Sequence, residues 1–166
     1  MKNRNRFHRV FFVFLLWLLT QVVLIPVSGQ TTAISGVVNS YYPVLEVIPA
    51  KACIRLSSTA GLAVNTPILL VQMKGAGITT TNNSSFGTVT ALNDAGNYET
   101  ATICSIIGDS VFLFHLLQNT YTTAGGKVQL VPFATYVSAN VTDTVKATPW
   151  NNSSGTGGVI AIYAEQ

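Results

Sequence analysis

The sequence predicts an all-β fold, an antiparallel sandwich or a small barrel, preceded by an N-terminal signal peptide helix. Short β-branched runs alternate with turn clusters, which favours a sandwich or barrel over β–α–β units. No segment after residue 29 keeps a 3.6-residue apolar period. Charged residues form only 9% of the 166 residues, against roughly 25% in an average soluble domain. This scarcity excludes a coiled coil and a charge-rich disordered chain.

The first 29 residues have the layout of a secretory signal peptide. Four basic residues precede the apolar run Val10–Ile25, and Pro26-Val27-Ser28-Gly29 follows it. The small Gly29 predicts cleavage between Gly29 and Gln30. The alternative is an uncleaved membrane anchor. The run of 16 residues is shorter than the ~20 that span a bilayer as a helix, and Pro26 ends the helix, so cleavage is favoured.

Cleavage changes the charge of the chain. The whole sequence has nine basic and six acidic residues and a net charge of +3. Loss of the four basic residues within 1–29 leaves five basic and six acidic residues, a net charge of −1. The basic excess therefore belongs to the export signal, and the sequence predicts no nucleic-acid partner.

The expected strands follow one another along residues 30–166. They are apolar or β-branched runs bounded by Gly, Pro, Asn and Ser. In order they are Val44–Ile48, Cys53–Leu56, Ile68–Met73, Thr88–Leu92, Thr100–Ile107, Val111–Leu117, Lys127–Val131, Tyr136–Val141, Thr144–Ala147 and Val159–Ala164.

Turn chemistry supports several of these boundaries. Gly108-Asp109 separates two β-rich runs, which predicts a tight two-residue hairpin because Gly supplies a positive φ. Pro67 suits a strand start, where its missing N–H costs least. The Thr-, Asn- and Ser-rich stretch 75–87 is expected to be a long polar loop. Residues 155–158 are expected to be a flexible break. These signals predict three regions: a signal peptide at 1–29, a β-rich module at 30–154, and the start of a further β region of a longer chain at 155–166.

The same residues offer little for catalysis. The single histidine after residue 29, His115, lies in an apolar run, where a packed or outward-facing strand residue is the commoner role. Glu46 and Glu99 are the nearest candidates for a glycosidase pair, but nothing in their spacing supports one. There is no zinc-type cluster and no phosphate-binding loop. The sequence therefore predicts no enzyme, no cofactor and no metal site.

Two cysteines are a candidate disulfide. Cys53 and Cys104 both lie on expected strands of an exported chain, and export passes through an oxidising compartment. The alternative is a pair of buried free thiols, because reduced cysteine packs well as a small apolar group.

Aromatic side chains are the candidate ligand contacts. Tyrosine and tryptophan combine a large apolar face with a polar end, and when exposed they suit stacking on sugars. Inter-strand packing is the alternative role for each of them. The candidates are Tyr41, Tyr42, Tyr98 and Trp150.

An ordered set of short motifs resembles a known group of proteins. The set resembles the N-terminal region of very large exported surface proteins of gliding bacteria, some described as adventurous-gliding and others as gliding-motility-associated or adhesin-like. Relatives continue into a long repetitive body, which implies that this chain begins a longer protein. The resemblance runs from Val38 to Ala164 and rests on Asn39–Leu45, Leu69–Ala76, Gly96–Glu99, Val128–Pro132, Ala147–Asn151 and Gly157–Val159.

The resemblance implies an extracellular β-rich module whose parent works in adhesion or gliding. The expected function is a non-enzymatic, exported cell-surface module with a structural or adhesive role. The alternative is a carbohydrate-binding accessory module of an exported polysaccharide-active protein. The expected partner is a cell-surface or extracellular polysaccharide or protein surface, with membrane contact only through the signal peptide. The expected location is extracellular or cell-surface, or periplasmic if the chain ends at Gln166.

Overall fold

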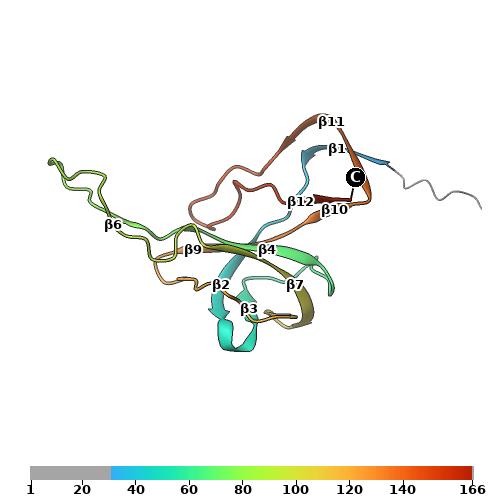
Figure 1. The fold of residues 1–166 in the computed structure, drawn as a ribbon, viewed down its shortest axis with the longest axis horizontal. Coiled ribbons are helices and arrows are strands. Elements are labelled where there is room, and N and C mark those ends of the chain that lie inside the picture. The colour runs from blue at the N-terminus through green and yellow to red at the C-terminus, as the bar shows by residue number, and fades with distance from the viewer. Residues whose placement is uncertain (1–30, 166) are drawn as a thin grey trace, which may run out of the picture.

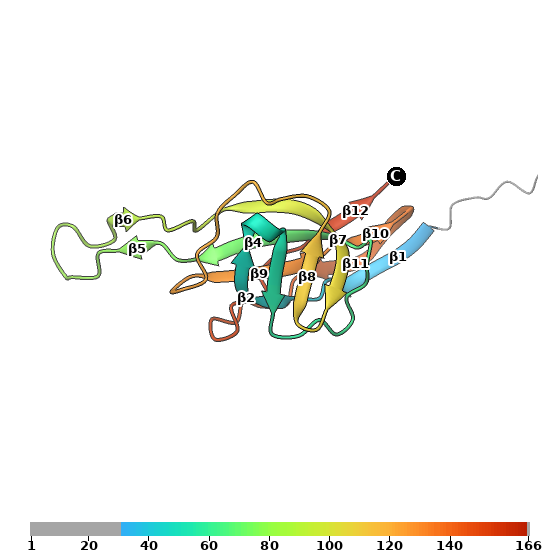
Figure 2. The ribbon, with the colours of Figure 1, turned by 90° about the horizontal axis from the view of Figure 1, so that it is seen from below.

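Six strands close into an antiparallel barrel in the computed structural model, which describes residues 31–165 (Figures 1 and 2). The predicted signal peptide and its cleavage site at Gly29 and Gln30 lie outside the described residues. The all-β prediction is confirmed, and of its two architectures the structure has the barrel. Around the barrel the strands are β2 (Tyr42–Ile48), β3 (Cys53–Leu56), β8 (Ser110–Leu113), β7 (Tyr98–Ile107), β4 (Pro67–Lys74) and β9 (Lys127–Pro132).

The barrel interior is filled by aliphatic side chains. Strand β4 shows why: Ile68, Leu70 and Gln72 are fully buried, while the residues between them are partly exposed. Successive side chains of a strand point to opposite faces, so one face of β4 lines the interior. Removal of this apolar surface from water drives closure. The other fully buried apolar side chains are Ile54, Leu56, Ile103, Val111, Leu130 and Val131.

The predicted hairpin at Gly108-Asp109 is confirmed. Ile107 pairs with Ser110, so two residues form the turn, and Gly108 has a φ of 61°. A positive φ at the first turn residue alone is the type II′ pattern, which matches the twist of the flanking strands. The strand after the turn is shorter than predicted, because β8 ends at Leu113 and residues 114–117 leave the sheet.

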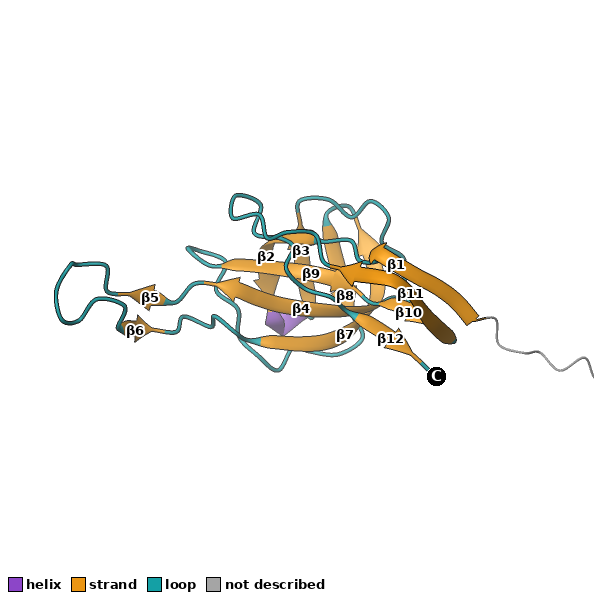
Figure 3. Ribbon diagram, turned by 90° about the horizontal axis from the view of Figure 1, so that it is seen from above, coloured by secondary structure: helices purple, strands orange, loops and turns teal. Residues whose placement is uncertain are grey.

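A two-stranded arm extends from the barrel between β4 and β7 (Figures 2 and 3). We call residues 75–97 the arm. It contains β5 (Gly77–Ile78) and β6 (Val89–Ala91), which pair antiparallel. The stretch 75–87, predicted as a plain loop, therefore supplies one leg of the arm. Thr88–Leu92, predicted as a strand, supplies the other.

Two parallel strand pairs lie at the end of the molecule opposite the arm (Figure 3). Strand β1 (Thr31–Val37) pairs with β11 (Ser138–Lys146), and β10 (Ala134–Tyr136) pairs with β12 (Ile162–Ala164). The prediction of antiparallel sheets is wrong for these pairs. Parallel pairing joins segments far apart in sequence, so no local turn signal announces it. A short 3₁₀ turn, η1 (Pro49–Lys51), links β2 and β3.

Residues 155–164 contact segments on the other side of the predicted boundary at residue 155. Gln129 on β9 exchanges two buried hydrogen bonds with the backbone of Gly157, each of 2.9 Å. Asn39 likewise donates to the carbonyl of Ala161 at 2.7 Å and accepts from its N–H at 3.0 Å. These contacts and the pairing of β12 with β10 join residues 155–164 to the rest of the described chain.

Within residues 31–165, no helix has the length and apolar character needed to cross a membrane.

Candidate functional site

The arm contributes no residue to the hydrophobic core cluster of the described chain. Its residues 75–92 carry no charged side chain and no proline. Four large apolar side chains along it are half to two-thirds exposed: Ile78, Phe86, Val89 and Leu92. These side chains are available for contact with a partner.

The arm keeps its shape through its own hydrogen bonds. Thr79 N–H donates to the carbonyl of Thr88, and Gly87 N–H donates to that of Thr79, both at 2.9 Å. At the tip, the side-chain oxygen of Asn83 accepts from Ser85 N–H at 2.9 Å. The Asn side chain thereby mimics a backbone turn. The arm is thus a defined element, although it is separate from the core.

A buried amide holds both legs of the arm where they leave the barrel. Gln72 Nε2 donates to the carbonyl of Asn93 at 2.7 Å and to that of Lys74 at 3.2 Å. Its Oε1 accepts from Thr122 N–H at 2.8 Å. Gly75 has a φ of +153°, and a Cβ there would lie 2.7 Å from Gln72 Nε2. Glycine is therefore required where the backbone passes this amide.

The returning leg of the arm is tied to the loop that follows β8. Both oxygens of the Asp94 carboxylate accept hydrogen bonds, from Thr120 Oγ1 at 2.8 Å and from Thr122 Oγ1 at 2.7 Å. Asn97 Nδ2 donates to the carbonyl of Thr120 at 2.9 Å. With Gln72, these contacts fix the angle at which the arm leaves the barrel. We call Gln72, Gly75, Asn93, Asp94 and Thr122 the arm root.

The Glu99 carboxylate binds the same loop. It accepts from the N–H groups of Gln118 and Asn119 at 2.9 and 3.2 Å, and from Tyr121 Oη at 2.9 Å. Burial of Tyr121 raises the pKa of its phenol well above the ordinary value, and the hydrogen bond to Glu99 is the second, smaller cause of this shift. Glu99 therefore holds a loop, and the residue considered as its catalytic partner, Glu46, is engaged elsewhere.

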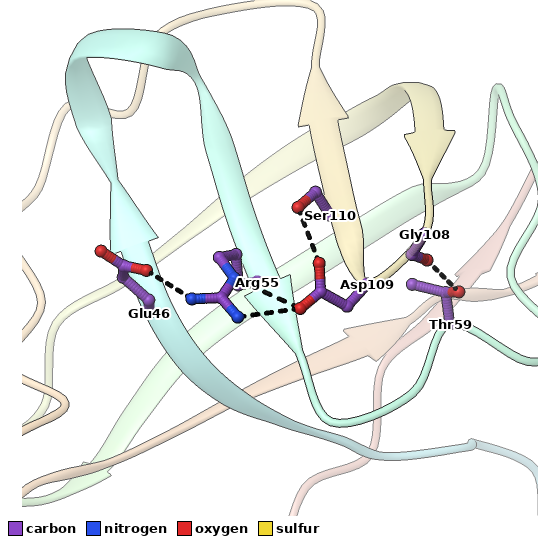
Figure 4. Close-up of polar contacts among 6 residues, drawn as sticks. All are labelled: Glu46, Arg55, Thr59, Gly108, Asp109 and Ser110. Atoms are coloured by element: carbon purple, nitrogen blue, oxygen red, sulfur yellow. Dashed lines mark hydrogen bonds and ion pairs between the residues drawn. The ribbon is translucent and has the colours of Figure 1, made fainter.

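Glu46 belongs to a charged cluster on the barrel wall (Figure 4). Arg55 on β3 lies between two carboxylates, 3.0 Å from Glu46 Oε2 and 2.9 Å from Asp109 Oδ2. The hydrogen bond from Arg55 is the main reason that the pKa of the Asp109 carboxyl lies below its usual range, and the hydrogen bond from Ser110 contributes less. All three charged side chains are nearly half exposed, so solvent screens the pairs and they stabilise weakly. The cluster ties the Gly108 hairpin to β3 and leaves no unpaired acid there.

Three of the four predicted aromatic contacts are half-buried, and the fourth is exposed. Tyr41 donates to the carbonyl of Val159 at 2.7 Å, and Tyr42 donates to that of Ala60 at 2.9 Å. Both rings are half-buried, so these two residues hold neighbouring segments. Trp150 is also half-buried, in the segment after β11. Tyr98 differs, because it is two-thirds exposed at the start of β7, directly after the arm.

The candidate disulfide is not formed. Cys53 is buried on β3 and Cys104 is exposed on β7, and both thiols are free. Strand β8 lies between these two strands, which places them about 9.5 Å apart at the usual ~4.8 Å strand spacing. A disulfide needs Cα atoms within about 7 Å. Burial raises the pKa of the Cys53 thiol, which makes it less reactive.

The part of the chain that the structure describes holds no cluster of three or more His, Cys, Asp or Glu side chains that could bind a metal ion. His115 is exposed in the loop after β8. A shallow hollow of about 310 Å³ lies at the end opposite the arm. Sequence reasoning missed it because three distant segments form it. Its lining residues are Pro67, Thr135, Tyr136, Val137, Tyr163 and Glu165.

Comparison with known proteins gives little further guidance. No protein-family profile matches the chain, and no curated protein matches it. Among solved structures, the chain is similar to the Gp54 tailspike of Acinetobacter baumannii bacteriophage AP22, determined in complex with A. baumannii capsular saccharide. The identity is 9%, the TM-score is 0.38, and the match covers 71% of this chain and 18% of the tailspike. A likeness of this strength assigns neither a fold family nor a function.

Proposed function

We propose that the protein is an exported, non-enzymatic surface module in which the barrel presents the arm for adhesive contact. The observation that carries the proposal is the placement of the arm. Strands β1 and β12, the first and last strands of the described chain, lie at the end of the molecule opposite the arm (Figures 2 and 3). A chain held at that end would direct the arm outward.

The polar side chains also support a role without catalysis. Glu46, Asp109, Asp94 and Glu99 each hold a neighbouring segment through hydrogen bonds or ion pairs. A catalytic acid or base needs access to a substrate and a pKa suited to proton transfer. These carboxylates are engaged in holding the fold. The layout of residues 1–29 supports export.

The test compares the exported chain with a variant that lacks the arm tip. Residues 80–87 are replaced by Asn-Gly, which joins Thr79 to Thr88 through a two-residue turn. Fluorescently labelled protein is bound to cells of the organism that encodes it and to extracted extracellular polysaccharide. We expect the excision to abolish binding while the circular dichroism spectrum is retained. Equal binding by the excised variant would contradict the proposal.

A carbohydrate-binding accessory role is the second candidate, and the exposure of Tyr98 favours it. An exposed aromatic ring can stack on a sugar, and Tyr98 is two-thirds exposed at the start of β7, directly after the arm. A glycan array compares the wild type with Tyr98→Ala. Tyr163→Ala is the matched control, because Tyr163 is similarly exposed but lies at the opposite end. This role predicts glycan binding that only Tyr98→Ala removes, and it is excluded if no glycan binds.

A further inference from the structure

We propose that the arm binds the arm of a second copy of this chain, edge to edge, so that the partner of this surface is the protein itself. The proposal deepens the adhesive function above and rests on the arm being the contact surface. The contact joins arm strands of two molecules as neighbouring strands of one small sheet.

The unprotected edges of the arm support this inference. Strands β5 and β6 form a two-stranded sheet in the described chain, so each has one edge that no other strand covers. Exposed edges present free N–H and C=O groups, and proteins usually guard them with charged side chains or proline. Residues 75–92 contain neither. They contain Thr79, Thr80, Thr81, Thr88 and Thr90, whose β-branched side chains favour pairing in a sheet.

The absence of charge in residues 75–92 favours a second copy as the partner. In a two-fold contact each surface meets the same surface on the other molecule, so any charge faces its own kind. Like charges directly opposite each other across strands are destabilising. Residues 75–92 carry no charge and meet their counterparts without repulsion. The exposed Phe86, Val89 and Leu92 supply apolar surface to bury on association.

The rest of the molecule permits the contact. The arm projects from the barrel on the side opposite strands β1 and β12, so it is accessible to the arm of a second copy (Figure 3). The arm root fixes the direction of the arm through the partly buried hydrogen bonds of the Gln72 side chain. A pre-oriented arm loses less conformational freedom on binding than a mobile loop would.

Sedimentation velocity over a range of concentrations tests the proposal on the exported chain. We expect the wild-type mass to double as the concentration rises. Val89→Lys and Val89→Glu should each remain monomeric, because each places like charges across the contact. An equimolar mixture of the two variants should recover the doubled mass, and added salt should reverse that recovery.

Val64→Lys is the matched control. Val64 is as exposed as Val89, but it lies in the loop before β4, at the other end of that strand from the arm. It should dimerise like the wild type, and thermal melts should show that all variants are folded. A monomeric wild type, or dissociation by Val64→Lys as well, would overturn the proposal. A wild type that binds cells but remains monomeric would overturn it and leave the proposed function standing. A dimer that binds no cell or polysaccharide surface would support the arm-to-arm contact and contradict the proposed adhesive function.

Discussion

Three amide side chains hold the barrel to the segments around it. Gln72, Gln129 and Asn39 are buried, and each is paired with backbone groups of a distant segment. The structure records no buried side-chain polar atom without a partner among the residues it describes. A buried amide without partners would destabilise the fold, whereas a paired one selects which segment lies against it.

Replacement of Gln72 tests this role. Gln72→Ala removes the hydrogen-bond partners of the Asn93 carbonyl and the Thr122 N–H, and each of these partly buried groups left unpaired costs about 1–2 kcal/mol. We expect the free energy of unfolding in urea to fall by roughly 2–4 kcal/mol. Gln118→Ala, at an exposed residue, is the control and should change it by less than about 0.5 kcal/mol. Similar losses for the two variants would contradict the role assigned to Gln72.

Tyr121 makes a distinct prediction for alkaline pH. Its pKa is raised above the ordinary value of 10.0, so above that pH the unfolded chain releases the phenolic proton while the folded chain retains it. The stabilisation is complete below pH 10 and falls as the pH rises further. Tyr121→Phe cannot ionise at this position. At pH 9 we expect Tyr121→Phe to have a lower free energy of unfolding in urea than the wild type. This difference in the free energy of unfolding should become smaller between pH 9 and pH 11. A constant deficit would count against this assignment.

The two thiols should differ in reactivity. The thiolate is the reactive form, and Cys53 is buried with a raised pKa whereas Cys104 is exposed. In the native protein we expect iodoacetamide to modify Cys104 quickly and Cys53 slowly, as read by mass spectrometry. In denaturant without a reductant both should react. Failure of both to react there would show that they form a disulfide after all.

At the scale of elements, the strands could be predicted where local patterns decide them. Cys53–Leu56 has the predicted bounds, and the Gly108 hairpin follows from turn chemistry. Strand β1 could not be predicted, because Ile34 is its single buried residue and its partner β11 lies over a hundred residues away. The burial of Gln72 could have been predicted, because Gln72 continues the alternation of the inward-facing Ile68 and Leu70 along β4. Its polar side chain, however, is more typical of a residue that faces solvent.

The hairpin and the arm should respond differently to the same kind of substitution. Gly108→Ala places a Cβ at a φ of 61°, which should lower the free energy of unfolding by about 1–2 kcal/mol. Gly87→Ala is similarly strained at a φ of +84°, but it lies in the arm. Because the arm can open separately from the core, we expect Gly87→Ala to leave the urea midpoint unchanged. Equal shifts would mean that the arm and the barrel unfold together.

At the scale of the whole molecule, the barrel should be stable without the arm tip. The core cluster of the described chain is built from barrel strands and adjoining loops and includes no arm residue. Excision of residues 80–87 as above should therefore change the free energy of unfolding in urea by less than about 0.5 kcal/mol. A loss of several kcal/mol or of cooperative unfolding would show that the arm supports the core.

The parallel pair β1–β11 has a consequence for how the chain folds. Thr31 bonds to Ser138, 107 residues later, and Asn39 bonds to Ala161, 122 residues later. Contacts this distant in sequence form slowly, because the entropy of closing a long loop is lost before the contact forms. Strand β1 therefore has no partner until β11 has been synthesised. The side chain of Asn39 finds its partner later still, once residue 161 has emerged.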